Sequence, residues 1–158
     1  MHDTVLESNI KEEIGPVIEG SGFSVVELKI GRSHRSVRVT IVVYSDAGVG
    51  VDDLTSLSRM IKPRLELLEE LGEFTLVCTS PGIDREIKDR SEYAIFKGRG
   101  VKVLLNNERD WLGGIIKDDD NSFLYLQTSQ GLKNIEFETI SKAKLDYDQE
   151  VGSIEHVL

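Results

Sequence analysis

The chain has 158 residues, 39% hydrophobic and 30% charged, a balance typical of a folded globular protein rather than a disordered one. Its net charge of −9 argues against sequence-independent nucleic-acid binding and favours basic partners. No apolar run approaches the ~18 residues that span a bilayer, and residues 1–4 lack the basic start of a signal peptide. One cysteine, Cys78, excludes an internal disulfide, so we expect a cytoplasmic protein without membrane association.

The chain begins with a predicted helix and a predicted hairpin. Apolar residues recur at helical spacing over 4–20, and Pro16 within this stretch predicts a kink or a break. Alternating apolar residues then predict strands over 23–30 and 37–44. Residues 31–36 join these strands as the turn of a hairpin.

A second helix and a third strand complete the first half of the chain. Asp52 can cap the helix, and a leucine and isoleucine stripe continues to Leu68. Pro63 predicts either a kink or a helix followed by a short second one. Residues 73–79 form a strand in which Cys78 is interpreted as a buried structural thiol. The order helix, strand, strand, helix, strand predicts an α/β sandwich with its helices on one face of the sheet.

The third strand ends in a segment that we call the signature turn: Ser80, Pro81, Gly82, Ile83, Asp84 and Arg85. Pro81 and Gly82 suit the two central positions of a type II turn. Arg85 can bind a phosphate or a carboxylate bidentately, and Asp84 can orient it. The alternative is a loop that only ends a strand.

Beyond about residue 90 the pattern becomes β-rich. A short helical turn over 91–96, with Tyr93 and Phe96 facing inward, precedes five predicted strands at 101–105, 111–117, 122–128, 132–137 and 143–147. Closely spaced short strands predict a small β-barrel, with a sharp bend at Gly113-Gly114. Trp111 is either a core residue or a surface anchor, and we favour the core. The predicted domains are therefore 1–90 and 91–150, followed by a tail at 151–158 of unassigned order.

Catalytic motifs are not evident. The histidines His2, His34 and His156 have no second ligand at metal-binding spacing, and no Walker loop, dinucleotide fingerprint or nucleophile elbow occurs. The run 118–120 of three aspartates could attract a divalent cation, but it fits a solvated hairpin turn better. We therefore predict no enzymatic activity, no cofactor and no metal.

Basic residues concentrate in the first predicted hairpin. Residues 29–38 include Lys29, Arg32, His34, Arg35 and Arg38, with no acidic residue among them. On an acidic protein this is a local positive surface suited to phosphate, although a solvated hairpin end is the alternative.

In their order and spacing, these segments resemble the bacterial ribosome maturation factor RimP family over about residues 5–147. The signature turn at 80–85 is the most specific match, supported by 48–54, 96–99, 101–103 and 140–145. The family usually has serine in place of Thr79 and proline in place of Glu86. The segment 44–47 also lacks a lysine that often follows its aspartate. A carboxylate at Glu86 could partly neutralise Arg85.

The resemblance implies a non-enzymatic, monomeric assembly factor with an N-terminal α/β domain and a C-terminal SH3-like or Sm-like barrel. It implies binding to the immature small (30S) ribosomal subunit, through 16S rRNA and the basic small-subunit ribosomal protein twelve. The candidate rRNA-binding residues are Lys29, Arg32, Arg35, Arg38, Arg85 and Lys88. The alternatives are a regulator that binds free single-stranded RNA through an Sm-like barrel and, more remotely, a hydrolase that uses Asp84.

Overall fold

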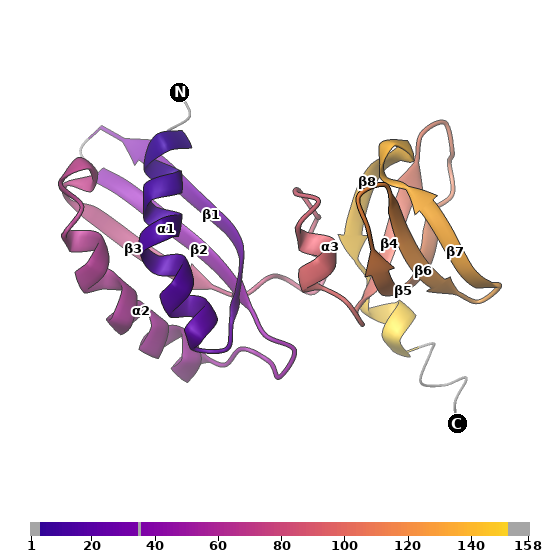
Figure 1. Ribbon diagram of the computed structural model, residues 1–158, viewed down its shortest axis with the longest axis horizontal. Coiled ribbons are helices and arrows are strands. Elements are labelled where there is room, and N and C mark those ends of the chain that lie inside the picture. The colour runs from indigo at the N-terminus through magenta and orange to yellow at the C-terminus, as the bar shows by residue number, and fades with distance from the viewer. Residues whose placement is uncertain (1–3, 35, 152–158) are drawn as a thin grey trace. The chain divides into compact units, whose positions relative to one another are not determined.

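The computed structural model describes residues 4–34 and 36–151, which form helices and two separate sheets (Figure 1). The chain divides between Pro81 and Gly82 into two compact units, called here the first and second units. The predicted boundary after residue 90 therefore lies within the second unit. Apart from Val151, the tail at 151–158 is outside the described residues. No helix of the described ranges is long and apolar enough to cross a membrane.

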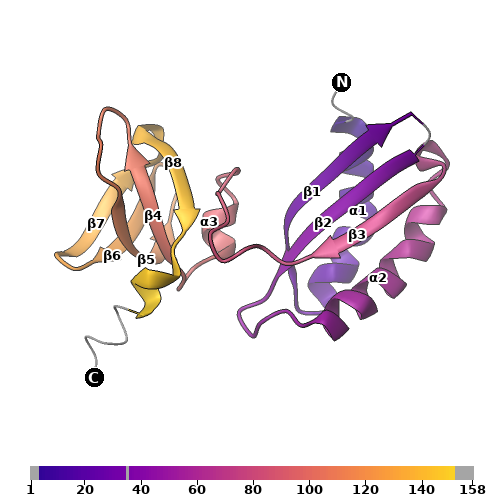
Figure 2. The ribbon, with the colours of Figure 1, turned by 180° about the vertical axis from the view of Figure 1, so that it is seen from behind.

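The first unit has the predicted element order. It contains α1 (Thr4–Gly20), β1 (Ser24–Ser33), β2 (Ser36–Tyr44), α2 (Val51–Glu66), the 3-10 helix η1 (Glu69–Leu71) and β3 (Phe74–Thr79). The sheet order is β1-β2-β3, in which β1 is antiparallel to β2 and β3 is parallel to it. Both α-helices cover the same face of this sheet, as the front and rear views agree (Figures 1 and 2).

Aliphatic side chains from every layer form the core of the first unit. The fully buried set is Leu6, Ile10, Ile14, Ile18, Val39, Ile41, Val43, Leu57, Ile61, Leu65 and Leu71. Its members recur at every fourth residue on α1 and α2 and at every second residue on β2, as the periods of helix and strand require. Cys78 packs against this core from β3, and desolvation raises the pKa of its thiol, as expected for a structural cysteine.

Neither proline ends its helix. α1 continues through Pro16 and α2 continues through Pro63, so the predicted break in the first helix is wrong. Each proline lacks the N–H that would bind the carbonyl four residues earlier, at Glu12 and Arg59 respectively. These four positions are exposed to solvent, where water can satisfy the freed carbonyls.

The cap of α2 also differs from the prediction. Gly50 is the N-cap residue, and its N–H donates a 2.8 Å hydrogen bond to the carboxylate of Asp53. Asp52, the predicted cap, lies within the first turn instead. Both aspartates still lie at the positive end of the helix dipole.

The second unit is built mainly from one antiparallel sheet. Its elements are α3 (Glu92–Ile95), β4 (Gly100–Leu105), β5 (Leu112–Asp119), β6 (Phe123–Thr128), β7 (Gly131–Glu136), the 3-10 helix η2 (Phe137–Thr139) and β8 (Ile140–Leu145). Residues 147–151 are helical. The strand order is β7-β6-β5-β4-β8. All five predicted strands are present, but β7 and β8 do not pair within the described residues, so a closed barrel is not confirmed.

The bend of β5 and the position of Trp111 differ from the sequence interpretation. Gly113 and Gly114 permit close packing, since a Cβ at Gly114 would lie 2.7 Å from the carbonyl oxygen of Gln127. A sharp bend was predicted at Gly113-Gly114, but the irregular pairing of β5 lies further along the strand, between Ile116 and Asp118. Trp111, expected in the core, is 37% exposed. Tyr93 and Phe96 are buried, as predicted.

Candidate functional site

The signature turn lies two residues later than predicted. The N–H of Arg85 donates to the carbonyl of Gly82 at 3.1 Å, so the turn comprises Gly82 to Arg85. Gly82 does not have the positive φ that a type II turn requires at its third position, and the predicted turn type is therefore wrong. Ile83 and Asp84 occupy the centre of the turn, and both are exposed.

The residues after the turn pair with the edge of the second sheet. The N–H of Leu145 donates to the carbonyl of Arg85 at 2.9 Å, and the N–H of Ile87 donates to the carbonyl of Ala143 at 2.9 Å. Between them, Glu86 lies opposite Lys144 in an antiparallel bridge. Residues 85–87 therefore add a very short strand to β8, and this edge pairing belongs wholly to the second unit.

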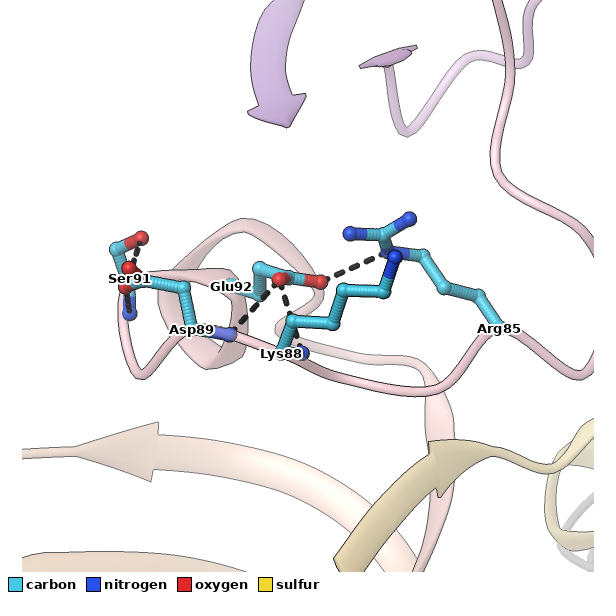
Figure 3. A network of polar contacts seen from close by, with 5 residues as sticks. All are labelled: Arg85, Lys88, Asp89, Ser91 and Glu92. Atoms are coloured by element: carbon cyan, nitrogen blue, oxygen red, sulfur yellow. Dashed lines mark hydrogen bonds and ion pairs between the residues drawn. The ribbon is translucent and has the colours of Figure 1, made fainter. Parts of the chain in front are cut away.

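A buried carboxylate holds this segment in place (Figure 3). Glu92 Oε1 lies 2.8 Å from Arg85 Nε, and Glu92 Oε2 accepts the N–H groups of Lys88 at 3.1 Å and Asp89 at 3.0 Å. The side chains of Arg85 and Glu92 are only 8% and 1% exposed. One cation and two backbone donors thus compensate the desolvation of the Glu92 carboxylate.

This contact gives Arg85 a structural role. A guanidinium that is almost fully buried against Glu92 is not displayed on the surface of the second unit, as a phosphate-binding arginine would be. The sequence interpretation paired Arg85 with Asp84 and did not single out Glu92, because a lone glutamate in a short helical turn resembles a solvent-exposed residue. Its position at the start of α3 was the available signal, since carboxylates favour helix N-termini. Lys88 has an exposed side chain.

The basic hairpin is closed tightly at its tip. Ser33 pairs with Ser36, and their hydroxyl oxygens are 2.8 Å apart. The strand register places Lys29 and Arg38 on the face that α1 and α2 leave uncovered. Arg32 pairs with Val37 and lies on the other face. The basic residues therefore surround the hairpin rather than form one flat patch, and the predicted Arg35 lies outside the described residues.

A hollow of about 420 Å³ accompanies this hairpin, lined by Gly31, Arg32, Ser33, Ser36, Val37, Arg38 and Thr75. Two exposed arginines and three hydroxyl-bearing residues contribute to it. Guanidinium and hydroxyl groups are the usual side-chain donors to phosphate oxygens. Of the predicted rRNA-binding residues, the structure brings Arg32 and Arg38 together here. Arg85 and Lys88 belong to the second unit.

The second unit carries a hollow of about 260 Å³ with acidic walls. It is lined by Arg90, Asn121, Ser122, Phe123, Glu136, Phe137 and Glu138. The guanidinium of Arg90 lies 4.0 Å from the centroid of the Phe137 ring, and Glu136 and Glu138 are exposed. Aromatic and carboxylate walls are suited to a lysine or arginine side chain from a partner. We call this site the acidic hollow.

The aspartate run beside the acidic hollow serves the β5–β6 turn. Asp120 Oδ1 accepts the N–H groups of Ser122 at 2.8 Å and Phe123 at 2.7 Å, and the hydroxyl of Tyr125 donates to Asp120 Oδ2. These hydrogen bonds, led by that from Tyr125, lower the pKa of Asp120. Asp118 forms a 3.0 Å ion pair with Lys97. Within residues 4–34 and 36–151, no cluster of three or more histidine, cysteine, aspartate or glutamate side chains could hold a metal ion.

Comparison with known proteins identifies the family. The model of the RimP N-terminal domain matches residues 13–84. A ribosome maturation factor RimP from Borrelia garinii subsp. bavariensis is 37% identical over 128 residues, which cover 80% of this chain and 86% of the relative. Relatives of the same name from Borrelia hermsii and Borreliella burgdorferi are 33% and 35% identical, covering 87% and 77% of this chain and 94% and 82% of their own lengths. The resemblance of the sequence is thereby confirmed, and the chain belongs to the ribosome maturation factor RimP family.

Proposed function

We propose that the chain is a non-enzymatic assembly factor that binds the immature small (30S) ribosomal subunit in the cytoplasm and promotes its maturation. The observation that carries this proposal is the match to ribosome maturation factors along most of the chain. A factor of this kind must bind transiently, which two modest contacts on one chain can achieve through their combined avidity. We assign one contact to each unit and regard the units as two domains of a monomer.

The first unit is proposed to face 16S rRNA through the basic hairpin. Arg32 and Arg38 line the hollow described above, and Lys29 lies on the same face as Arg38. Arg35 and Lys88 remain additional candidates from the sequence. Arg85 is proposed to act indirectly, by holding residues 85–92 of the second unit in their folded position. The local positive charge of the hairpin can orient the first unit as it approaches RNA.

The second unit is proposed to adopt an SH3-like barrel and to contact the basic small-subunit ribosomal protein twelve. The acidic hollow supports this assignment, because Glu136 and Glu138 can pair with a cationic segment. The guanidinium of Arg90 already lies over the Phe137 ring, so the two glutamates carry this assignment.

Replacing Lys29, Arg32 and Arg38 together with alanine is expected to weaken binding to immature 30S particles by about tenfold to a hundredfold. The measurement is co-sedimentation over a series of salt concentrations, in which the salt slope should fall by about 0.7–0.9 per lost phosphate contact. The matched control replaces Lys11, Arg59 and Lys62, three exposed cations on the helices of the same unit. Equal affinity and equal salt slope for the hairpin variant would contradict the assignment of the first unit to rRNA.

Reversing two charges in the acidic hollow tests the second contact. Glu136→Lys combined with Glu138→Lys is expected to weaken binding of the full-length chain to purified ribosomal protein twelve by at least about tenfold, since each change replaces an attraction with a repulsion. Isothermal titration calorimetry measures the affinity. Glu66→Lys combined with Glu70→Lys, at exposed positions of the first unit, makes the same change in net charge. If both double variants bind alike, the acidic hollow is not the contact.

A further inference from the structure

Trp111 occupies an unusual position for the single tryptophan of a chain. It immediately precedes β5 and is 37% exposed. The strand that follows pairs with β4, where Gly113 lies opposite Lys102. The space above this glycine is filled by the end of the Gln149 side chain, whose atoms would overlap a Cβ at Gly113.

Two lysines support the indole ring from the sheet. Lys102 on β4 lies directly opposite Lys144 on β8, so both side chains leave the same face. Their sequence neighbours Val101, Val103, Ala143 and Leu145 are buried, so this face points away from the core. The Nζ atoms of Lys102 and Lys144 each lie 5.3 Å from the centroid of the Trp111 ring. This spacing is typical of cation–π contact, which fixes the ring across the two ammonium groups.

We propose that Lys102, Trp111 and Lys144 form a binding site for single-stranded RNA. An exposed indole gives a nucleobase a flat surface on which to stack, and two adjacent ammonium groups match the phosphates on either side of that base. Base-paired RNA does not fit this chemistry, because its bases are already stacked inside the helix. An acidic protein segment would pair with the lysines but would make no use of the exposed part of the indole.

This site goes beyond the proposed function, which assigns rRNA to the first unit. It gives the second unit a nucleic-acid contact of its own, at residues distinct from those that line the acidic hollow. The two lysines make this site locally positive although the net charge of the chain is −9, and that local charge complements the phosphates of RNA. Glu86 lies opposite Lys144 on the side away from Lys102 and opposes binding by reducing the local positive charge.

The fluorescence of Trp111 reports directly on this contact. Titrating the full-length chain with an oligoadenylate of about eight nucleotides should quench the emission as a base stacks on the ring. Inorganic polyphosphate carries the charges without the bases, so it should quench far less. The absence of quenching by RNA, or equal quenching by both anions, would overturn the stacking site. Ribosomal particles are absent from this experiment, so its result is independent of the proposed function.

Variants then test each component by anisotropy of a labelled oligonucleotide. Trp111→Leu should weaken binding by about fivefold to a hundredfold, the range of one base–aromatic stack. Lys102→Gln with Lys144→Gln should lower the salt slope by about 0.7 per lysine. Glu86→Gln should tighten binding by about twofold, an outcome that partial unfolding could not produce. The control Lys62→Gln with Lys117→Gln changes the net charge equally at exposed positions elsewhere. An equal loss of affinity in the control, or no gain in the Glu86 variant, would contradict the proposal.

Discussion

Glu92→Ala is expected to destabilise the second unit by about 3–5 kcal/mol, because it leaves the guanidinium of Arg85 buried without its carboxylate. It also removes the acceptor for two backbone N–H groups, those of Lys88 and Asp89. Urea unfolding followed by Trp111 fluorescence measures the effect, since the only tryptophan lies in this unit. Glu86→Ala, at an exposed neighbouring position, should change stability by less than about 0.5 kcal/mol.

A double variant separates the ion pair from the packing around it. Arg85→Met with Glu92→Leu removes both charges and fills similar volume, so it should be less destabilising than Glu92→Ala alone. The double variant should regain stability only if the buried charge of Arg85, left without the Glu92 carboxylate, accounts for most of the destabilisation in Glu92→Ala. Near-normal stability of the Glu92→Ala variant would instead show that the carboxylate contributes little.

Gly100→Ala is expected to cost about 1–3 kcal/mol through overpacking. A Cβ at this position would overlap the carbonyl oxygen of Asp146 and lie 2.8 Å from Gln149 Cβ. The helical residues 147–151 are anchored there, because the N–H of Gly100 and Nε of Arg99 both contact Glu150 Oε2, at 3.1 Å and 3.0 Å. The extra methyl group should therefore displace this segment from the sheet.

Gly113→Ala provides the matched control for this change. The nearest atoms to its Cβ would be those at the end of the Gln149 side chain. Displacing that end breaks the 3.0 Å hydrogen bond that it donates to Asp146, so we expect a loss of about 1 kcal/mol. Urea unfolding gives both stabilities, and hydrogen exchange at residues 147–151 shows whether the segment detaches. Equal losses in the two alanine variants would contradict the packing argument.

The spacing of apolar residues predicted the helices and strands of both units. Each element buries one face, and that burial determines where its apolar residues recur. The alternation in β2 and the leucine and isoleucine stripe of α2 each place their apolar residues in the core of the first unit. The five later strands were also found, since each is short, apolar and bounded by turn residues. Boundaries were less well predicted, as β8 begins at Ile140 rather than at 143.

The candidate site was harder to predict because tertiary contacts decide its details. Glu92 and Arg85 are brought together by the path of residues 85–92, and no local pattern shows that both are buried. The side of the sheet on which Arg32 lies follows from the hairpin register, which the length of the turn fixes. Trp111 was expected in the core on hydrophobicity alone, whereas the opposite lysines that retain it at the surface come from β4 and β8.

The bridge between residues 85–87 and β8 has a consequence for self-association. A terminal strand with free amide and carbonyl groups is a template on which a second molecule can extend the sheet. Here the carbonyl of Ala143 and the N–H of Leu145 are already engaged by the chain itself. Proteolytic removal of everything before Ile87 would release Leu145 from that protection, and intermolecular β-aggregation of the remaining fragment would follow.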